Sequence, residues 1–405
     1  MSRTPPLPRL FLALLLLAAS WTGALASEEL WSDSGFFVDM PAGFQLQDGD
    51  GKTRFAFADP EGIMEFDILA YESGRYAGAE ALAADSIRRL GSAGESESFS
   101  YEGRKAVFAE LAFGLDGGKR KGFAIYIEGR KAQAPAAAPQ AGAPAAKAGA
   151  PERHYALLVH AAEADFDSCL PFFLSCLDSF SIDRGARRAP GPLSQYLLPW
   201  PPERKALKKV LLPGGASVEL PWSPREASQE EETAAREHGV LKAYAEDPEL
   251  ALEAWARFYR MVYRESAARL DRLALELARS LPRDDPTETA RRILAWVQLF
   301  VYERDLEGID FVPPLASAYE ARGDCDARAV VAVALLERLG IDAILMLSSA
   351  YSHALFAVDV PGGGQRFAFG GKNYLVAETT AKVGLGMIAQ DQADWSKWLG
   401  VQLGD

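Results

Sequence analysis

The sequence predicts an α+β protein with an N-terminal antiparallel α/β sandwich, a helical connector, and a C-terminal domain in which a helix packs on an antiparallel sheet. Three observations predict this class. Short apolar or alternating runs typical of strands, such as Arg54–Phe57 and Met64–Leu69, occur through the first part of the chain. Two long segments, 230–244 and 248–281, carry apolar residues at helical spacing. Near the C-terminus an apolar helix is expected to begin at Cys325, and strand-like runs follow it.

Length and charge limit the function classes. A chain of 405 residues with 49% hydrophobic residues is long enough for two or three domains with their own cores. The formal net charge of −13 argues against nucleic acid as the main partner, because a polyanion would be repelled.

Residues 1–26 are predicted to be a signal peptide. Arg3 and Arg9 give a positively charged start, an apolar run covers Leu10–Ala19, and Ala24-Leu25-Ala26 has the form of a cleavage site before Ser27. An uncleaved membrane anchor is the alternative, although the apolar run is short for a span. We therefore expect a periplasmic or secreted protein without a lipoprotein site and without a membrane span after cleavage.

The N-terminal domain is expected to cover residues 27–184, with helices over Ala79–Leu90 and Phe166–Phe180. Within it, residues 132–151 are almost entirely Ala, Pro, Gly and Gln, which lack the bulk to build a core. We interpret this segment as a disordered hairpin loop. Residues 185–224, rich in proline, are expected to form an irregular connector.

Two groups of side chains in the N-terminal domain could form a disulfide or a metal site. Cys169 and Cys176 are seven residues apart, which on a helix separates their Cα atoms by roughly 10 Å, beyond disulfide reach. Two buried thiols are favoured, and a bridge stays open because Pro171 lies between them. His154 and His160 share a strand face, but no further metal ligands are evident, so we expect no metal there.

The C-terminal part, residues 225–405, begins with helices. The aromatic stripe of the second long helix, which includes Trp255, Phe258, Tyr259 and Tyr263, is one-sided and regular, so core packing is favoured over a ligand face. A helix is predicted over Thr287–Val301, and it begins the core of this C-terminal domain, residues 287–390.

The stretch from Arg322 to Arg328 contains the residues with the clearest chemistry. Asp324 is a good N-cap, which puts Cys325 at the first position of the helix, where the helix dipole favours thiolate. We therefore expect the pKa of the Cys325 thiol to lie below its ordinary value. His353 begins one predicted strand and Glu378 lies near the end of another, 374–379, so nucleophile, base and orienting carboxylate follow in order.

These motifs resemble the transglutaminase-like, or papain-like, cysteine hydrolases. The resemblance rests on WVQLFVYERD (296–305), the Pro-Leu turn at 314–315, GDCD (323–326) and Glu-Thr-Thr (378–380). It is closest to the microbial secreted branch. It implies a Cys-His-Glu triad of Cys325, His353 and Glu378, with Glu replacing the Asp used by many members. FFVDMPAGF (36–44) and LDSFSID (177–183) resemble the photosystem extrinsic-protein type of α/β sandwich.

The donors for the oxyanion are less defined. The backbone N–H of Cys325 is one candidate, and Gln298, on the helix of the WVQ motif, is another, unless it is simply a polar helix position. Asp324 and Asp326 are interpreted as capping and first-turn charges in preference to a cation site. No cofactor and no metal are expected.

Two functions follow as hypotheses. The first is a secreted cysteine protease, amidase or acyl transferase that acts on a peptide or protein substrate through an acyl-enzyme. The second is a catalytically silent transglutaminase-like domain that binds peptides or scaffolds an envelope complex. In either case the N-terminal domain is expected to bind a cell-envelope partner. The sequence does not choose between hydrolysis and transfer.

Overall fold

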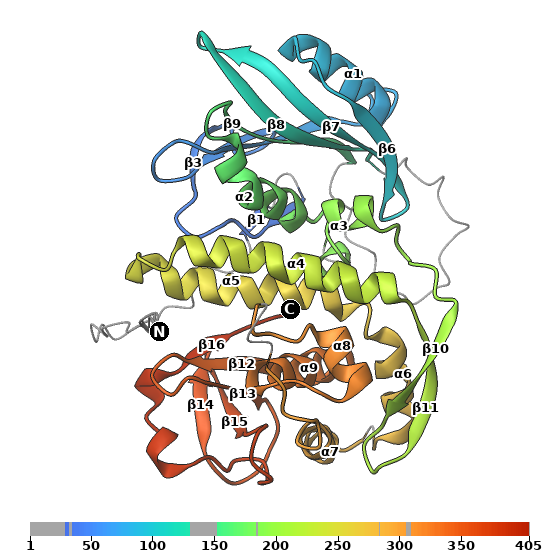
Figure 1. Cartoon of the computed structure of the whole chain (residues 1–405), viewed down its shortest axis with the longest axis vertical. Helices are drawn as coiled ribbons and strands as arrows, with labels where there is room; N and C mark the ends of the chain where they lie inside the picture. Colours follow the sequence, from blue (N-terminus) through green and yellow to red (C-terminus); the bar gives the residue numbers. More distant parts are fainter. Residues whose placement is uncertain are drawn as a thin grey trace, which may run out of the picture.

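The computed structural model describes residues 29–31, 35–129, 152–183, 185–282, 284–304 and 309–404. The predicted signal peptide, residues 1–26, and the Ala/Pro segment 132–151 lie outside the described residues. The fold is α+β, with an N-terminal sheet domain, a layer of two long helices across the middle, and a C-terminal domain with helices on a second sheet (Figure 1). No helix among the described residues combines the length and apolar character needed to span a membrane.

The N-terminal domain is built on a seven-stranded antiparallel sheet in the order β3-β4-β5-β9-β8-β7-β6. Its strands are β3 (Gln45–Gly49), β4 (Arg54–Ala58), β5 (Glu65–Glu72), β6 (Ser96–Tyr101), β7 (Arg104–Leu115), β8 (Gly118–Ile127) and β9 (Arg153–Ala162). A separate antiparallel pair is formed by β1 (Glu29–Trp31) and β2 (Phe36–Val38). β8 and β9, on either side of the Ala/Pro segment, pair directly with each other, as a hairpin would.

Helices cover both faces of this sheet. Leu157 and Val159 on β9 pack in the same core as α2 (Phe166–Ser179), while Leu158 packs in the core of α1 (Ala79–Leu90). This alternation is what a strand buried on both faces requires. The two strands that the sequence did not predict, β3 and β6, lie at the two edges and are mostly exposed, so they carry no apolar pattern.

The expectation of an irregular connector over 185–224 is wrong in part. After a 3-10 turn (Ala186–Arg188) and α3 (Pro192–Leu197), the chain forms an antiparallel hairpin of β10 (Ala206–Leu211) and β11 (Ser217–Trp222). The turn between the strands contains Gly214 and Gly215 at φ +86° and +87°, a conformation that glycine adopts without strain. The Pro-Gly-Gly sequence is therefore a hairpin signal.

The central layer consists of α4 (Pro224–Ala243) and α5 (Pro248–Ala267), followed by α6 (Asp271–Ser280) and α7 (Pro286–Val297). The predicted helix 248–281 is thus two helices. The predicted aromatic stripe is confirmed as core, since Phe258, Tyr259 and Tyr263 are almost fully buried.

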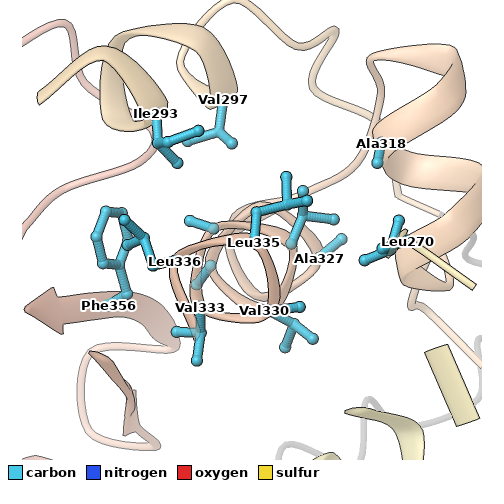
Figure 2. Packing of buried hydrophobic residues seen from close by; sticks show 14 of the residues in the cluster. Leu270, Ile293, Val297, Ala318, Ala327, Val330, Val333, Leu335, Leu336 and Phe356 are labelled. Carbon is cyan, nitrogen blue, oxygen red and sulfur yellow. The ribbon is translucent and has the colours of Figure 1, made fainter. Parts of the chain in front are cut away.

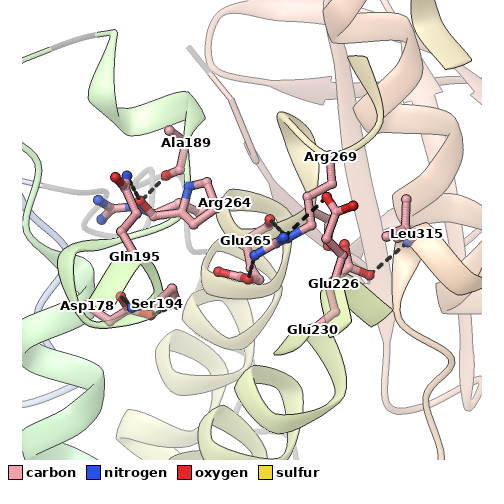
Figure 3. A network of polar contacts seen from close by, with 12 residues as sticks. Asp178, Ala189, Ser194, Gln195, Glu226, Glu230, Arg264, Glu265, Arg269 and Leu315 are labelled. Atoms are coloured by element: carbon pink, nitrogen blue, oxygen red, sulfur yellow. Dashed lines mark hydrogen bonds and ion pairs between the residues drawn. The ribbon is translucent and has the colours of Figure 1, made fainter. Parts of the chain in front are cut away.

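The opposite side of α5 contacts the N-terminal domain through arginines. Arg257 donates to the carbonyl oxygen of Asp39 at 2.9 Å, and Arg260 pairs with the Asp39 carboxylate at 2.7 Å. Arg264 binds the carbonyl oxygens of Ser179 and Phe180. Figure 3 shows Arg264 and the polar network that continues along α5 toward the C-terminal domain. One helix therefore joins both domains.

The C-terminal sheet has the order β14-β15-β13-β12-β16. Its elements are α8 (Pro314–Glu320), α9 (Cys325–Arg338), β12 (Ala343–Ser348), β13 (His353–Val358), β14 (Arg366–Phe369), β15 (Lys372–Ala377), 3-10 turns at Gln390–Gln392 and Trp395–Lys397, and β16 (Leu399–Val401). Helix α9 packs on one face of the sheet and is surrounded by apolar side chains from α7, α8 and β13, including Ile293, Ala318 and Phe356 (Figure 2). A helix that is apolar on all sides is a core helix.

Glu230 of α4 is a buried carboxylate in the network of Figure 3. The backbone N–H of Leu315, near the start of α8, donates to Glu230 Oε2 at 2.9 Å. Burial raises the pKa of Glu230 to about 8, against the opposing effect of Arg269. The folded protein therefore keeps a proton that the unfolded chain releases above its ordinary pKa, and stability falls as pH rises through this window.

We predict that Glu230→Gln stabilises the protein relative to wild type as pH rises from 4.5 to about 8. Glutamine still accepts from Leu315 and carries no charge, so the gain is on the order of a few kcal/mol at pH 8. Thermal unfolding at pH 5, 6.5 and 8 measures it, with Glu231→Gln, at the adjacent exposed carboxylate of the same helix, as control. A difference in Tm that does not change with pH would contradict the assignment.

Candidate active site

Cys325 is the first residue of α9, as predicted. The Asp324 side chain caps the helix by accepting the Ala327 N–H at 3.3 Å. The preceding Gly323 has φ +141°, and a Cβ there would lie 2.8 Å from that of Ala327, so the turn into the helix requires glycine. The half-buried Cys325 sulfur accepts N–H groups of Ala354 and Asp326. The thiol therefore lies beside the first turn of its own helix and the start of β13.

His353 and Glu378 are brought into direct contact. Imidazole Nε2 lies 2.8 Å from Glu378 Oε2, because β13 and β15 are neighbours in the sheet. The other carboxylate oxygen accepts the Thr380 N–H at 2.7 Å and its hydroxyl at 2.6 Å. Glu378 lies one residue beyond β15, not within the strand as predicted. Burial alone would raise the pKa of Glu378, but His353 and Thr380 lower it below its ordinary value, so the carboxylate is charged.

The contact between Cys325 and His353 is less direct. Ala354, whose N–H reaches the sulfur, follows His353 in the chain. The imidazole ring lies 6.2 Å from the ring of Trp398, which belongs to the apolar cluster on the sheet face away from α9. Between these described residues the structure contains no hydrogen bond from the thiol to the imidazole. The histidine and glutamate are thus paired, while the cysteine is adjacent to them through the backbone.

Gln298, the second candidate for the oxyanion, has another role here. Its side-chain nitrogen donates to the carbonyl oxygens of Glu378 at 2.8 Å and of Val383 at 3.0 Å. Both of its N–H groups are therefore committed, and they fix the segment that carries the Glu378 carboxylate. The Cys325 backbone N–H remains a candidate donor, since the first N–H groups of a helix have no partner within it.

Arg328, one turn into α9, was not singled out from the sequence. It is 3% exposed. Its guanidinium donates to three backbone carbonyl oxygens, those of Gly323 at 3.0 Å, Phe300 at 2.7 Å and Thr379 at 3.1 Å. Arg328 therefore ties the turn before Cys325 to the segment after Glu378. A charged residue in an apolar helix is the sequence signal that could have found it.

Tyr259 of α5 also reaches the site. Its hydroxyl donates to Asp326 Oδ2 at 2.5 Å, and Asp326 Oδ1 accepts the Ala327 N–H at 2.9 Å. Burial, with the charge and the hydrogen bond of Asp326, raises the pKa of Tyr259 well above its ordinary value. The tyrosine therefore stays a donor and holds the Asp326 carboxylate next to Cys325.

The expected low pKa of the Cys325 thiol is contradicted. Burial, followed by the charges of Asp326 and Asp324, raises the pKa of the thiol to about 12. Burial, followed by the hydrogen bond and charge of Asp326, also raises the pKa of Asp324 to about 9. Burial, together with the negative charge at this helix start, outweighs the helix dipole, which alone favours thiolate.

One metal-like grouping occurs in the described part of the chain: ligand atoms of Asp324, Cys325 and Asp326 lie within 4.8 Å of one another. A cation would compete with the Tyr259 hydroxyl and the Ala327 N–H for Asp326, so capping explains both carboxyls. In the same described part, no such grouping includes His154 or His160.

Cys169 and Cys176 are buried free thiols, in agreement with the favoured prediction. Burial raises the pKa of Cys176 to about 12.

Comparison with known proteins gives little. No protein-family model matches the chain, and no curated protein matches it. Among solved structures, LpqN, described as involved in cell envelope biogenesis of Mycobacterium tuberculosis, is 12% identical with a TM-score of 0.25 and covers 36% of this chain and 82% of its own. A structure from Bacteroides thetaiotaomicron VPI-5482 is 9% identical with a TM-score of 0.26 and covers 86% of this chain and 89% of its own. With such TM-scores, function has to be argued from the site itself.

We predict that Asp326→Asn lowers the pKa of the Cys325 thiol. The substitution removes the charge with the largest effect on the thiol, while asparagine can still accept from Ala327 and donate to the Tyr259 oxygen. A decrease of about one pKa unit would raise the thiolate fraction about tenfold, so iodoacetamide should alkylate Cys325 about tenfold faster at pH 8.

Peptide mapping by mass spectrometry measures this rate against the buried Cys169 and Cys176 in the same sample. The control is Asp116→Asn, an exposed position at φ +50° that asparagine tolerates. Equal alkylation of wild type and Asp326→Asn across pH would show that Asp326 does not set the thiol pKa.

Proposed function

We propose that the protein is a thiol enzyme of transglutaminase-like type that hydrolyses or transfers the acyl group of peptide-like amides. The observation that carries the proposal is the 2.8 Å contact of His353 Nε2 with the charged Glu378, next to a cysteine at a helix N-terminus. Such a pair is the usual arrangement of a base and its orienting group. Export to the periplasm or medium, carried by residues 1–26, remains part of the proposal.

The direction of the His353–Glu378 bond determines which ring nitrogen can act as base. A charged carboxylate only accepts, so Nε2 carries the proton and Nδ1 of the neutral ring is the basic atom. Nδ1 would take the thiol proton as sulfur attacks the acyl carbon. It would then return that proton to the leaving amine, and an acyl-enzyme would remain on Cys325. Water or a second amine would release the acyl group, and free thiol would form again.

The high thiol pKa supports proton transfer during attack over a preformed thiolate. A thiol with a pKa of about 12 is ionised in only a very small fraction of molecules at pH 7.5. A reaction that depended on that fraction would be slow, so the base must take the proton in the transition state.

A second function has one observation in its favour. A thiol held protonated, without a hydrogen bond to the imidazole, also suits a catalytically silent domain that binds peptides or scaffolds an envelope complex. In that case the His353–Glu378 pair would serve only to hold β13 to the segment after β15.

Substitutions of the three residues distinguish these functions. Cys325→Ala should abolish amide hydrolysis or acyl transfer, and His353→Ala should reduce kcat by a factor on the order of 10³ or more, because it removes the base. Glu378→Gln should cost less, since the carboxylate orients the ring and does not itself transfer the proton. Turnover of a fluorogenic peptide library, followed by single-peptide kinetics, provides the measurement.

Cys169→Ala, at a buried cysteine of the N-terminal domain, is the matched control and should leave turnover unchanged. Full activity in His353→Ala would contradict the enzyme proposal. Absence of any turnover together with tight peptide binding that survives Cys325→Ala would favour the silent domain.

A further inference from the structure

A cavity of about 560 Å³ adjoins the His353–Glu378 pair. Cys325 does not line it. Facing the pair are Val383, Met387 and Ile388, from the segment after the Glu-Thr-Thr motif. The site therefore has a cavity next to His353, and the wall of this cavity is mostly apolar.

The cavity presents no unmatched charge. Its lining contains the hydrogen-bonded pair of His353 and Glu378, and both carboxylate oxygens are occupied, one by the imidazole and the other by Thr380. No lysine, arginine or second carboxylate is among its lining residues to pair with a charged group. A charged side chain would lose water there without gaining a partner, whereas an apolar one would be stabilised by about 25 cal/mol per Å² buried.

The wall is fixed in place before any ligand binds. Gln298 holds the carbonyl oxygen of Val383 at 3.0 Å. Gly386 donates to Val376 at 2.7 Å and accepts from Gln365 at 2.8 Å, which attaches the segment to the sheet. A preformed pocket binds without the entropy loss of ordering its wall.

The charge near Cys325 also favours an apolar substrate over an acidic one. Asp326 follows the thiol in the chain, and the whole chain has a net charge of −13. Exposed apolar side chains also occur there: Val301 is 65% and Tyr302 55% exposed, and the main chain of Val301 bonds to Gly323 at 2.9 Å. Acidic residues near the reacting bond would be repelled, and apolar ones would find surface to cover.

We propose that this cavity is a subsite for an uncharged, apolar side chain of the peptide-like substrate, and that the enzyme discriminates against acidic residues beside the reacting amide. The inference rests on the proposed function, because it takes the occupant of the cavity to be part of the molecule that Cys325 attacks. Met387, 55% exposed at the cavity, is assigned as a specificity residue. Its unbranched side chain can adapt to apolar groups of different shape.

The test uses dipeptidyl chloromethyl ketones that differ only in Leu or Glu at either residue. Sulfur forms a bond to the methylene carbon, chloride leaves, and the thiol proton passes to the imidazole or solvent. Intact mass and peptide mapping of the full chain give the labelling rate of Cys325, divided by its iodoacetamide rate. We expect a Leu over Glu preference of at least tenfold at one position, reduced at least threefold in Met387→Glu and restored in Met387→Leu.

Leu275→Glu, at a similarly exposed leucine on α6 with 51% exposure, is the control and should keep the wild-type preference. Equal rates with the Leu and Glu probes, while Cys325 is labelled, would overturn the subsite and leave the proposed function standing. If Met387→Glu leaves the preference for Leu over Glu unchanged, neither Met387 nor this cavity determines the specificity. No labelling of Cys325 by either probe or by iodoacetamide would overturn the proposed function and the subsite with it.

Discussion

The geometry of the site depends on the buried guanidinium of Arg328. Its three hydrogen bonds reach the turn before Cys325, the loop after α7 and the segment after Glu378, which are far apart in the chain. A hydrogen bond to a charged group contributes about 1.5–3 kcal/mol, so three of them offset the burial of one charge only when all three acceptors are in place. Because the acceptors are backbone atoms, Arg328 fixes where the main chain runs and thereby where the reactive side chains lie.

The same principle of polar contacts between distant segments connects the site to the rest of the molecule. Helix α5 presents arginines to the N-terminal domain, where Arg257 and Arg260 bind Asp39, and a tyrosine to the C-terminal domain, where Tyr259 binds Asp326. The N-terminal domain and the charge next to the thiol are therefore attached to one rigid element. A displacement of α5 would therefore change the surroundings of Cys325.

Local patterns predicted much of this structure. The start of α9 was predicted from Asp324 as N-cap and from the apolar run that follows it. The strands predicted to begin at His353 and to cover 374–379 correspond to β13 and β15, which pair with each other. These features depend on neighbours within a few residues, which is the range that capping and periodicity describe.

Features that depend on distant residues were missed. The contact of Tyr259 with Asp326 joins residues 67 apart, and the stripe pattern of α5 indicated only a core face. Gln298 was one of two candidates for the oxyanion donor, but its partners are carbonyl groups 80 and 85 residues away. The prediction of a low pKa for the Cys325 thiol was wrong for the same reason. The helix dipole and the N-cap can be recognised in the sequence, whereas burial and the position of Asp326 arise only in the fold.

The proposed function requires that Cys325 can carry an acyl group. Incubation of the full chain with p-nitrophenyl acetate, followed by intact mass and peptide mapping, tests this requirement most directly. We expect an acetyl group on Cys325, absent from Cys169 and Cys176, formed much more slowly in His353→Ala and removed by hydroxylamine. Acetylation confined to lysines, or equal acetylation of Cys325 with and without His353, would contradict it.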